Sequence, residues 1–182
     1  MPNVCLMAVG NVLTGDDGLG PYVLELLDAA YDFPPGVQVI DVGTPGIDLT
    51  MFLEPVEALV VIDAVKGDEA PGTVKTFRKA DLLKGRLPVV MSPHEPTLRE
   101  ALMRLELVGH GPRDVTVIGA VPAHLTLTES LSPPVKAAVP TVIAAVLSEL
   151  ERLGASPTPK ATPRTPVFWW EKPQGPAQGE VR

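Results

Sequence analysis

The sequence from residue 4 to residue 30 decides the fold and reads VCLMAVGNVLTGDDGLGPYVLELLDAA. Residues 4–9 are a continuous apolar run that predicts a strand, and the spacing of apolar residues over 21–30 predicts a helix. Glycines at positions 10, 15, 18 and 20 let the intervening loop turn sharply, because glycine admits positive φ. Gly20 is a candidate N-cap, with Pro21 at the first helical position. We expect the rest of the chain to be organised around this loop, residues 10–20.

Two adjacent carboxylates, Asp16 and Asp17, lie in the middle of the loop. Glycine-rich turns between a strand and a helix often hold a phosphate. This loop, however, lacks the G-x-G-x-x-G spacing and the P-loop lysine, and its carboxylates would repel a pyrophosphate. An acidic loop at a strand end suits a cation better. The carboxylates could equally cap the next helix and favour its positive end, so the loop by itself leaves both interpretations open.

The composition is that of one globular domain. The chain has 182 residues, of which 45% are hydrophobic, and its mean hydropathy is +0.20, so it can bury a substantial core. The formal charge of −7 and an isoelectric point near 4.9 argue against nucleic acid as a partner. The same acidity is compatible with a bound cation or a basic protein partner.

Cysteine content and apolar runs indicate the compartment. Cys5 is the single cysteine, so no internal disulfide can form, and its place in the first apolar run predicts a core residue rather than a catalytic one. The N-terminus lacks a basic segment followed by a long apolar stretch, and no uncharged apolar run reaches membrane-spanning length. We therefore expect a cytoplasmic protein without a signal peptide or a membrane span.

Predicted strands alternate with predicted helices along the chain. Further strands are expected at residues 37–41, 58–62, 73–78 and 114–120, and further helices at 47–53, at 92–108 or 96–108, and at 132–153. Residues 58–62 show no polar alternation, which predicts a central strand covered on both faces. The apolar stretch 87–91 is too short for its pattern to decide whether it pairs. This order predicts an α/β fold in three layers, with a mostly parallel sheet between helices.

The end of the chain differs from the rest. Residues 1–154 are expected to form the domain, with Gly154 ending its last helix. Residues 155–182 are rich in proline, glycine, threonine and charge, which predicts a flexible tail. Trp169 and Trp170, the two tryptophans of the chain, lie in this tail beside Phe168. The aromatic group either docks on this domain or on a partner, or belongs to a solvated terminus without a role, and the sequence leaves these alternatives open.

Polar side chains lie where three predicted strands end. Asp16 follows the first strand, Asp41 ends the second and Asp63 follows the third, while His94 lies just before a helix or in its first turn. Ligands bind beyond the carboxyl ends of strands in an open parallel sheet, and right-handed crossovers bring these connections to one edge. Aspartate and histidine suit a divalent ion such as zinc or nickel. The pattern indicates a candidate metal site, although Asp63 could merely accept hydrogen bonds from the next turn and His94 could merely begin a helix.

The motifs of other catalytic classes are missing from the sequence. It contains no G-x-S-x-G elbow, no H-E-x-x-H pair and no C-x-x-C pair, so serine hydrolases, zincins and zinc ribbons are not supported. His110 and His124 lie in loops flanked by glycine or proline and are expected to be surface residues. The residues alone therefore support an α/β domain with a candidate Asp/Asp/His metal site.

At these residues the chain strongly resembles the maturation endopeptidases of nickel–iron hydrogenases, in the same order over about residues 3–153. The matching motifs are Gly10-Asn11-x-Leu13-x-x-Asp16-Asp17-Gly18-x-Gly20, Asp41-x-Gly43-Thr44, Val60-Val61-Ile62-Asp63-Ala64, Ser92-x-His94, Ile118-Gly119-x-x-Pro122 and Leu131-Ser132-Pro133-x-Val135. The first motif is fairly specific, and the ordered set is much more so. The resemblance implies a five-stranded sheet between helices.

The resemblance also implies a function. Such a protein is a hydrolase, an aspartyl-type endopeptidase that clips a short C-terminal extension from a hydrogenase large-subunit precursor once nickel has been inserted, and so activates the hydrogenase. In that family an acidic residue of the first loop, the aspartate ending the third strand and the histidine form a metal site. The corresponding residues here are Asp16, Asp63 and His94, which would act in catalysis through the metal.

Substrate discrimination in the family is linked to the turn after the second strand, here Asp41, Gly43 and Thr44. We expect the precursor to carry the nickel, so that the three metal-site residues are a docking site for it and not a permanent cofactor site. Zinc or cadmium is expected to be able to replace nickel in vitro. The expected partner is the large-subunit precursor, with no nucleic acid and no membrane, and the protein is expected to be a monomer.

Functions of other classes have weaker support. A germination-type spore protease has a related fold, but its acidic site would act without nickel. A small-ligand-binding α/β module would be stabilised by its ligand and would have no peptidase activity, and a scaffold would bind the precursor without cutting it. The combination of Asp16, Asp63 and His94 favours the nickel-linked endopeptidase over these alternatives.

Overall fold

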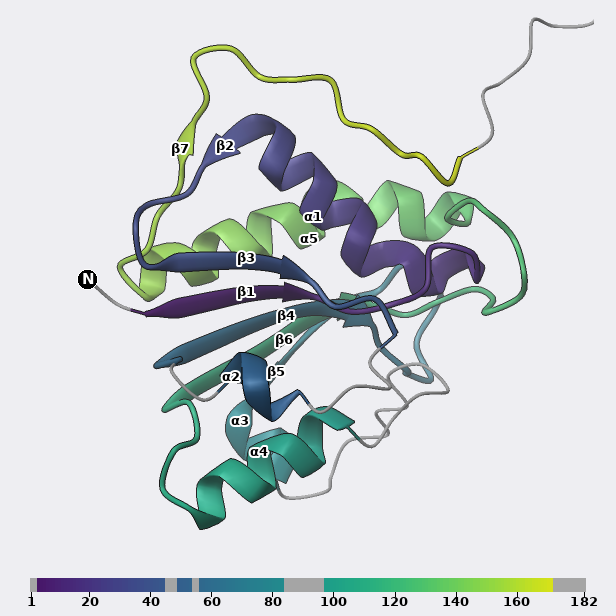
Figure 1. Ribbon diagram of the computed structural model, residues 1–182. Coiled ribbons are helices and arrows are strands. Elements are labelled where there is room, and N and C mark those ends of the chain that lie inside the picture. The colour runs from purple at the N-terminus through teal and green to yellow at the C-terminus, as the bar shows by residue number, and fades with distance from the viewer. Residues whose placement is uncertain (1–2, 45–48, 54–55, 84–96, 172–182) are drawn as a thin grey trace, which may run out of the picture.

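The computed structural model describes residues 3–44, 49–53, 56–83 and 97–171. This part of the chain forms strands, helices and one 3-10 turn (Figure 1). They are β1 (Val4–Ala8), η1 (Gly15–Gly18), α1 (Leu19–Ala30), β2 (Tyr31–Asp32), β3 (Val37–Asp41), α2 (Thr50–Leu53), β4 (Ala58–Ala64), β5 (Val74–Arg78), α3 (Lys79–Leu83), α4 (Thr97–Leu107), β6 (Asp114–Ala120), α5 (Pro133–Arg152) and β7 (Thr158–Pro159).

A five-stranded sheet forms the middle layer, with the strand order β3-β1-β4-β6-β5. The first four strands are parallel, and β5 closes one edge antiparallel to β6. In the register, Ala8 at the end of β1 lies opposite Asp41 of β3 and Ile62 of β4. The predicted mostly parallel, five-stranded α/β fold is confirmed, and the register places the first loop between the ends of β3 and β4.

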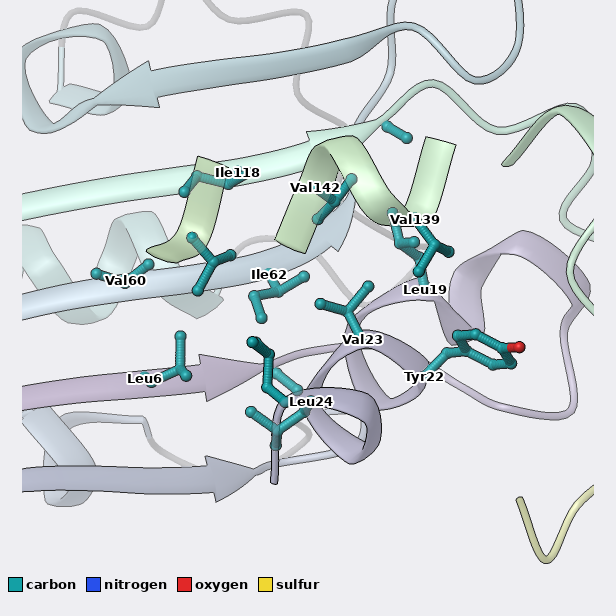
Figure 2. Close-up of a cluster of buried hydrophobic side chains, with 14 of the residues drawn as sticks. Leu6, Leu19, Tyr22, Val23, Leu24, Val60, Ile62, Ile118, Val139 and Val142 are labelled. Carbon is teal, nitrogen blue, oxygen red and sulfur yellow. The ribbon is translucent and has the colours of Figure 1, made fainter. Parts of the chain in front are cut away.

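Helices cover both faces of the sheet (Figure 1): α1 and α5 lie on one face, and α2, α3 and α4 lie on the other. All seven residues of β4 are buried, as expected for a central strand covered on both sides. Alternation along the strand sends Val60 and Ile62 into the core beneath α1 and α5, and Leu59 and Val61 into the core on the α4 side. Figure 2 shows the first of these cores, with Val23 of α1 among its members.

Gly20 has a different role from the predicted one. Helix α1 begins at Leu19 with Gly18 as its N-cap, so Gly20 already lies inside the first turn. A Cβ atom at Gly20 would lie 2.3 Å from the carbonyl oxygen of Val9 and 2.5 Å from that of Ile62. The absence of a side chain therefore lets α1 approach the ends of β1 and β4 closely, which holds the first loop directly over these two strands.

The start of the C-terminal tail packs against the domain. We call residues 155–171 the C-terminal segment. Its strand β7 pairs antiparallel with β2, and the Lys160 N–H donates to the Ala30 carbonyl at 2.9 Å. Phe168 and Trp170 pack against the core beneath α1 and α5. A flexible tail was expected from composition, but aromatic burial and these hydrogen bonds place residues 155–171 along α1 (Figure 1).

Helix α5 is a core helix. Among the described residues it is the one helix whose 20-residue length and composition would allow it to cross a membrane. Its apolar residues are already used inside the protein, where Val139, Val142 and Val146 are buried against the sheet and α1. Figure 2 shows Val139 and Val142 pointing toward Ile62 and Leu19. Packing of this kind produces the same apolar composition without a membrane.

The other differences from prediction concern edges and short elements. Strand β4 continues to Ala64, so Asp63 lies inside it rather than after it. The two-residue strands β2 and β7 and the five-residue helix α3 have too few residues for a periodic pattern. Residues 87–91 and the two alternative starts of the helix at 92 or 96 lie outside the described residues; α4 begins at Thr97.

A buried ion network joins α5 to the sheet at the end opposite the first loop. Glu149 accepts hydrogen bonds from Arg78 Nη1 at 2.5 Å, Thr116 Oγ1 at 2.7 Å and Arg152 Nη2 at 2.6 Å. The Glu149 side chain is 6% exposed. Its burial opposes ionisation, but the hydrogen bonds from Arg152, Arg78 and Thr116 outweigh burial and lower the pKa of Glu149 from 4.5 to about 2.

Acid is expected to weaken the fold through Glu149. Because its folded pKa lies below its ordinary value, Glu149 contributes stability above about pH 4.5 and loses it as the pH falls toward 2. The contribution at pH 7 is about 3 kcal/mol. Urea unfolding of the wild type and of Glu149→Gln should therefore differ by about this amount at pH 7 and by less than half of it at pH 3. An equal difference at both pH values would contradict this role.

Candidate functional site

Three buried carboxylates lie at the carboxyl ends of the central strands. Asp16 and Asp17 belong to η1, the next element after β1, and Asp63 lies near the end of β4; they are 0%, 1% and 0% exposed. From β1 the chain continues to β3 on one side of it, whereas β4 lies on its other side. Such a reversal of strand order opens a crevice where ligands bind in α/β sheets. Burying a carboxylate is unfavourable unless hydrogen bonds or a cation compensate the loss of water, so each of the three carboxylates needs such a partner.

Asp16 is held by four hydrogen bonds from a distant segment. Its Oδ2 accepts from the Ala123 N–H at 2.7 Å, the His124 N–H at 3.3 Å and the Ser132 Oγ at 2.8 Å, and its Oδ1 accepts from the Ser132 N–H at 2.6 Å. The Gly15 N–H also donates to the Thr128 carbonyl at 2.8 Å. Asp16 therefore fastens the first loop to residues 123–132, a role that neither capping of α1 nor cation binding anticipated.

Asp17 has a different environment from its neighbour. Its Oδ2 accepts a hydrogen bond from the Asn11 N–H at 2.9 Å, which is local to the loop. The loop folds tightly over Asp17: Gly10 has φ +136°, and a Cβ there would lie 1.8 Å from the Asp17 carbonyl oxygen. A residue other than glycine at position 10 would break this arrangement. The described hydrogen bond of Asp17 thus comes from within the loop, whereas distant donors engage both oxygens of Asp16.

Asp63 lies on the sheet face that carries α4. Alternation along β4 puts it on the same side as Leu59 and Val61, whose side chains are buried there. Its Oδ1 accepts a hydrogen bond from the Ala64 N–H at 2.7 Å, so it does bond to the backbone that follows, as the simpler interpretation of Asp63 expected. His94, three residues before α4 begins at Thr97, lies outside the described residues.

Two of the three residues of the predicted metal site, Asp16 and Asp63, therefore lie within the described residues. Among residues 3–44, 49–53, 56–83 and 97–171, no group of three or more His, Cys, Asp or Glu side chains is arranged to hold a metal ion. The two predicted ligands that are described, Asp16 and Asp63, both lie at the same end of the sheet. The set of Asp16, Asp63 and His94 stays a prediction. To bind a metal, Asp16 would have to exchange some of its hydrogen bonds for metal coordination.

The predicted recognition turn is hydrogen-bonded to the first loop. The Gly10 N–H donates to the Gly43 carbonyl at 2.9 Å, and Gly43 has φ +58°. Asp41 Oδ1 accepts from the Gly43 N–H at 2.8 Å, while Thr44 follows, partly buried. Desolvation raises the pKa of Asp41, and the Gly43 hydrogen bond opposes this rise. The structure thus brings the turn that contains Asp41, Gly43 and Thr44 beside the first loop.

Two open hollows flank this end of the sheet. The larger, of about 620 Å³, is lined by Leu13, Leu127, Thr128, Glu129, Ser130, Lys136 and Glu171. Its Leu13 and Leu127 are 42% and 89% exposed, and they come from the two loops that Asp16 joins. The smaller, of about 320 Å³, is lined by Pro21, Leu24, Glu25, Asp28, Val39, Asp41, Val167, Trp169 and Trp170. The larger hollow therefore borders the first loop, and the smaller one borders the recognition turn.

Sequence reasoning missed the residues that come from far along the chain. Ser132 was predicted only as a helix start, yet its hydroxyl and N–H both bind Asp16. His124 was expected at the surface and its side chain is exposed, but its backbone N–H also contacts Asp16. Trp169 and Trp170 were not connected with Asp41, beside which they line the smaller hollow. No local pattern in the sequence carries these pairings.

Comparison with known proteins gives a consistent family. The family model described as hydrogenase maturation protease matches residues 21–149. A hydrogenase expression/formation protein, HupM, of Azotobacter chroococcum mcd 1 is 34% identical over 160 residues, which cover 87% of this chain and 77% of that protein. The hydrogenase 2 maturation protease of Escherichia coli (strain K12) is 28% identical over 158 residues, covering 86% of this chain and 96% of that one.

Solved structures agree with the sequence comparisons. The hydrogenase maturating endopeptidase HybD from E. coli has a TM-score of 0.81 at 28% identity, and the match covers 88% of this chain and 99% of that chain. The [NiFe] hydrogenase maturation protease HybD from Thermococcus kodakarensis has a TM-score of 0.65 at 27% identity, covering 82% and 99%. Both matches span nearly the whole of the known structures.

Proposed function

This chain belongs to the hydrogenase maturation protease family, and on that premise we propose that it is an endopeptidase acting on a nickel–iron hydrogenase large-subunit precursor. It removes the C-terminal extension of the precursor after nickel insertion. The observation that supports this most strongly is the family match over residues 21–149, together with the buried carboxylates at the crevice of the sheet. We further propose that it acts as a cytoplasmic monomer; its net charge of −7 argues against nucleic acid as a partner.

We propose that the metal site uses Asp17 from the first loop, rather than Asp16, together with Asp63 and His94. Asp16 has both carboxylate oxygens engaged by four hydrogen bonds, which supports a structural role. Asp17 is equally buried, belongs to the same turn of η1 and has its described hydrogen bond from within the loop. Aspartate and histidine are suitable donors for nickel, and zinc or cadmium would be accepted by the same donors in vitro.

Nickel in this proposal arrives with the precursor. The ion could polarise the scissile carbonyl or position a water molecule, which are the contributions that metal ions make to hydrolysis. The residues of this chain would hold the ion and orient the substrate around it. The buried position of Asp17 and Asp63 supports their part in holding the ion, because a low-dielectric site strengthens the attraction of carboxylates for a cation. The recognition turn at Asp41 and Gly43 would contact the polypeptide beside the metal.

A cleavage assay separates this function from a binding module without peptidase activity. The purified full chain is mixed with nickel-loaded large-subunit precursors from several hydrogenases, and the products are weighed by mass spectrometry. Loss of a C-terminal peptide from at least one precursor is the expected result. Stable binding of a precursor without any change in its mass, under conditions in which that precursor's own maturation protease cuts it, would support the binding module and contradict the proposal.

A further inference from the structure

The C-terminal segment is fastened along α1 by contacts that direct its aromatic end to the candidate site. Arg164 Nη1 contacts Glu25 Oε1 at 2.5 Å, and Arg164 Nη2 contacts Asp28 Oδ2 at 2.6 Å. Phe168 then stacks on Tyr22, with ring centroids 4.2 Å apart and planes only 3° from parallel. Tyr22 lies at the end of α1 nearest the first loop, and Figure 2 shows it at the margin of the core.

The aromatic rings continue from the core to the surface. Trp170 lies edge-on to Phe168, with centroids 5.6 Å apart at 66°, and Trp169 lies edge-on to Trp170 at 5.6 Å and 89°. Trp169 is 74% exposed, whereas Trp170 is partly buried. A large aromatic side chain held at the surface by a partly buried neighbour is typical of a binding surface.

These tryptophans form a wall of the hollow that contains Asp41. We call this hollow of about 320 Å³ the tryptophan pocket. Val167, Trp169 and Trp170 contribute one side of it, while α1 and β3 contribute the rest, including Asp41. Asp41 in turn connects to the first loop through Gly43, since the Gly43 carbonyl accepts the Gly10 N–H at 2.9 Å. The pocket is therefore continuous with the recognition turn.

The charges of the pocket suit a cation. Glu25 and Asp28 also line it, and Arg164 already pairs with both. Within the described part of the chain, no lysine or arginine forms an ion pair with Asp41, whose described hydrogen bond is that from the Gly43 N–H. A carboxylate beside exposed tryptophan faces attracts a cationic group through both its charge and cation–π contact. A cation already contacts Tyr22, the ring at the other end of this row of stacked and edge-on aromatic side chains. Lys136 Nζ lies 5.8 Å from the centre of the Tyr22 ring.

We propose that the tryptophan pocket binds a lysine or arginine side chain of the hydrogenase precursor, next to the segment that is cleaved. The proposal rests on the proposed function and adds a specificity element to it. It assigns to the C-terminal segment, which lies beyond the matched residues 21–149, a part in substrate binding. The net charge of −7 makes the approach of a basic peptide favourable in any case, and the pocket fixes its register.

Steady-state cleavage of a nickel-loaded precursor tests this. Trp169→Ala and Asp41→Asn should each raise KM about tenfold with kcat unchanged, because each removes a ground-state contact with the cation. Trp169→Phe keeps an aromatic face and should restore most of the affinity. Replacing lysines and arginines near the cleavage site of the precursor by glutamine, one at a time, should identify one whose loss raises KM for the wild type but adds little in the Trp169→Ala variant.

Three outcomes would contradict the proposed binding of a basic side chain in the tryptophan pocket. One is an unchanged KM in Trp169→Ala. Another is a KM that Trp169→Ala raises equally for every precursor variant, together with a lowered Tm of Trp169→Ala, which would give Trp169 a structural role only. The third is a KM that no single basic residue of the precursor affects. Failure of the wild-type chain to cleave any precursor would instead contradict the proposed function, so the two failures are distinguishable.

Discussion

Asp17→Asn and Asp63→Asn variants are expected to fold normally and to cleave the nickel-loaded precursor about a thousandfold more slowly than the wild type. Both carboxylates are buried at the crevice, and asparagine has nearly the same shape as aspartate. The side-chain oxygen of asparagine can still accept the Asn11 N–H at position 17 and the Ala64 N–H at position 63. Each substitution removes the negative charge that attracts the metal. Removing a buried charge should leave the Tm unchanged or raise it.

Cleavage rates from product masses, together with thermal unfolding, check this prediction. Asp68→Asn is the matched control, because Asp68 is an exposed carboxylate in the loop after β4 and should not affect either measurement. His94→Ala is expected to lose cleavage in the same way. Wild-type cleavage by Asp17→Asn and Asp63→Asn would remove both residues from the metal site, and unfolding of either variant would show that its charge is needed for the fold.

Asp16→Ala is expected to lower the free energy of unfolding by about 4 kcal/mol, which corresponds to a fall in Tm on the order of 10 °C. The change removes the acceptor for four hydrogen bonds and leaves the buried N–H group of Ser132 without it. It also detaches the first loop from the segment that precedes α5. Asp16→Asn should be nearly as harmful, because its amide group cannot accept hydrogen bonds where the second carboxylate oxygen did.

Comparing the stability and the cleavage rate of the Asp16 variants with those of Asp17→Asn decides which of the two adjacent aspartates belongs to the metal site. Urea unfolding gives the stability of each variant, and cleavage is measured at a low temperature at which each is folded. Ser132→Ala, which removes one donor to Asp16, should show a smaller loss of stability in the same direction. If Asp16→Asn kept full stability and lost all cleavage, Asp16 would be the metal-site carboxylate and the assignment to Asp17 would be wrong.

The fold was predictable where the pattern is long and strongly apolar. The uninterrupted apolar run of β4 predicted a central strand buried on both faces, and all its residues are buried. The predicted strands at 37–41 and 114–120 agree with β3 and β6. Short elements were missed because two or five residues carry no period. The start of α1 was placed too late because Gly20 was taken as a cap, whereas its function depends on backbone from β1 and β4.

The site was predictable as a place but not in its detail. The order of strands predicted that Asp16, Asp41 and Asp63 share one end of the sheet, and the structure places them there. Which of the two adjacent aspartates faces which partner depends on Ala123 and Ser132, which lie 107 and 116 residues further along the chain. Such contacts follow from the packing of α5 against α1 and leave no local signal. Docking of the C-terminal segment likewise depends on Tyr22 and Glu25, which composition alone could not reveal.

The measurement that tests the central claim most directly compares one large-subunit precursor with and without inserted nickel. Each form is incubated with the purified, chelator-treated full chain, and the mass of the large subunit is followed over time. The proposed function predicts that the nickel-loaded form loses its C-terminal peptide while the nickel-free form keeps its full mass. Equal cleavage of both forms would contradict recognition of the precursor's nickel by Asp17, Asp63 and His94.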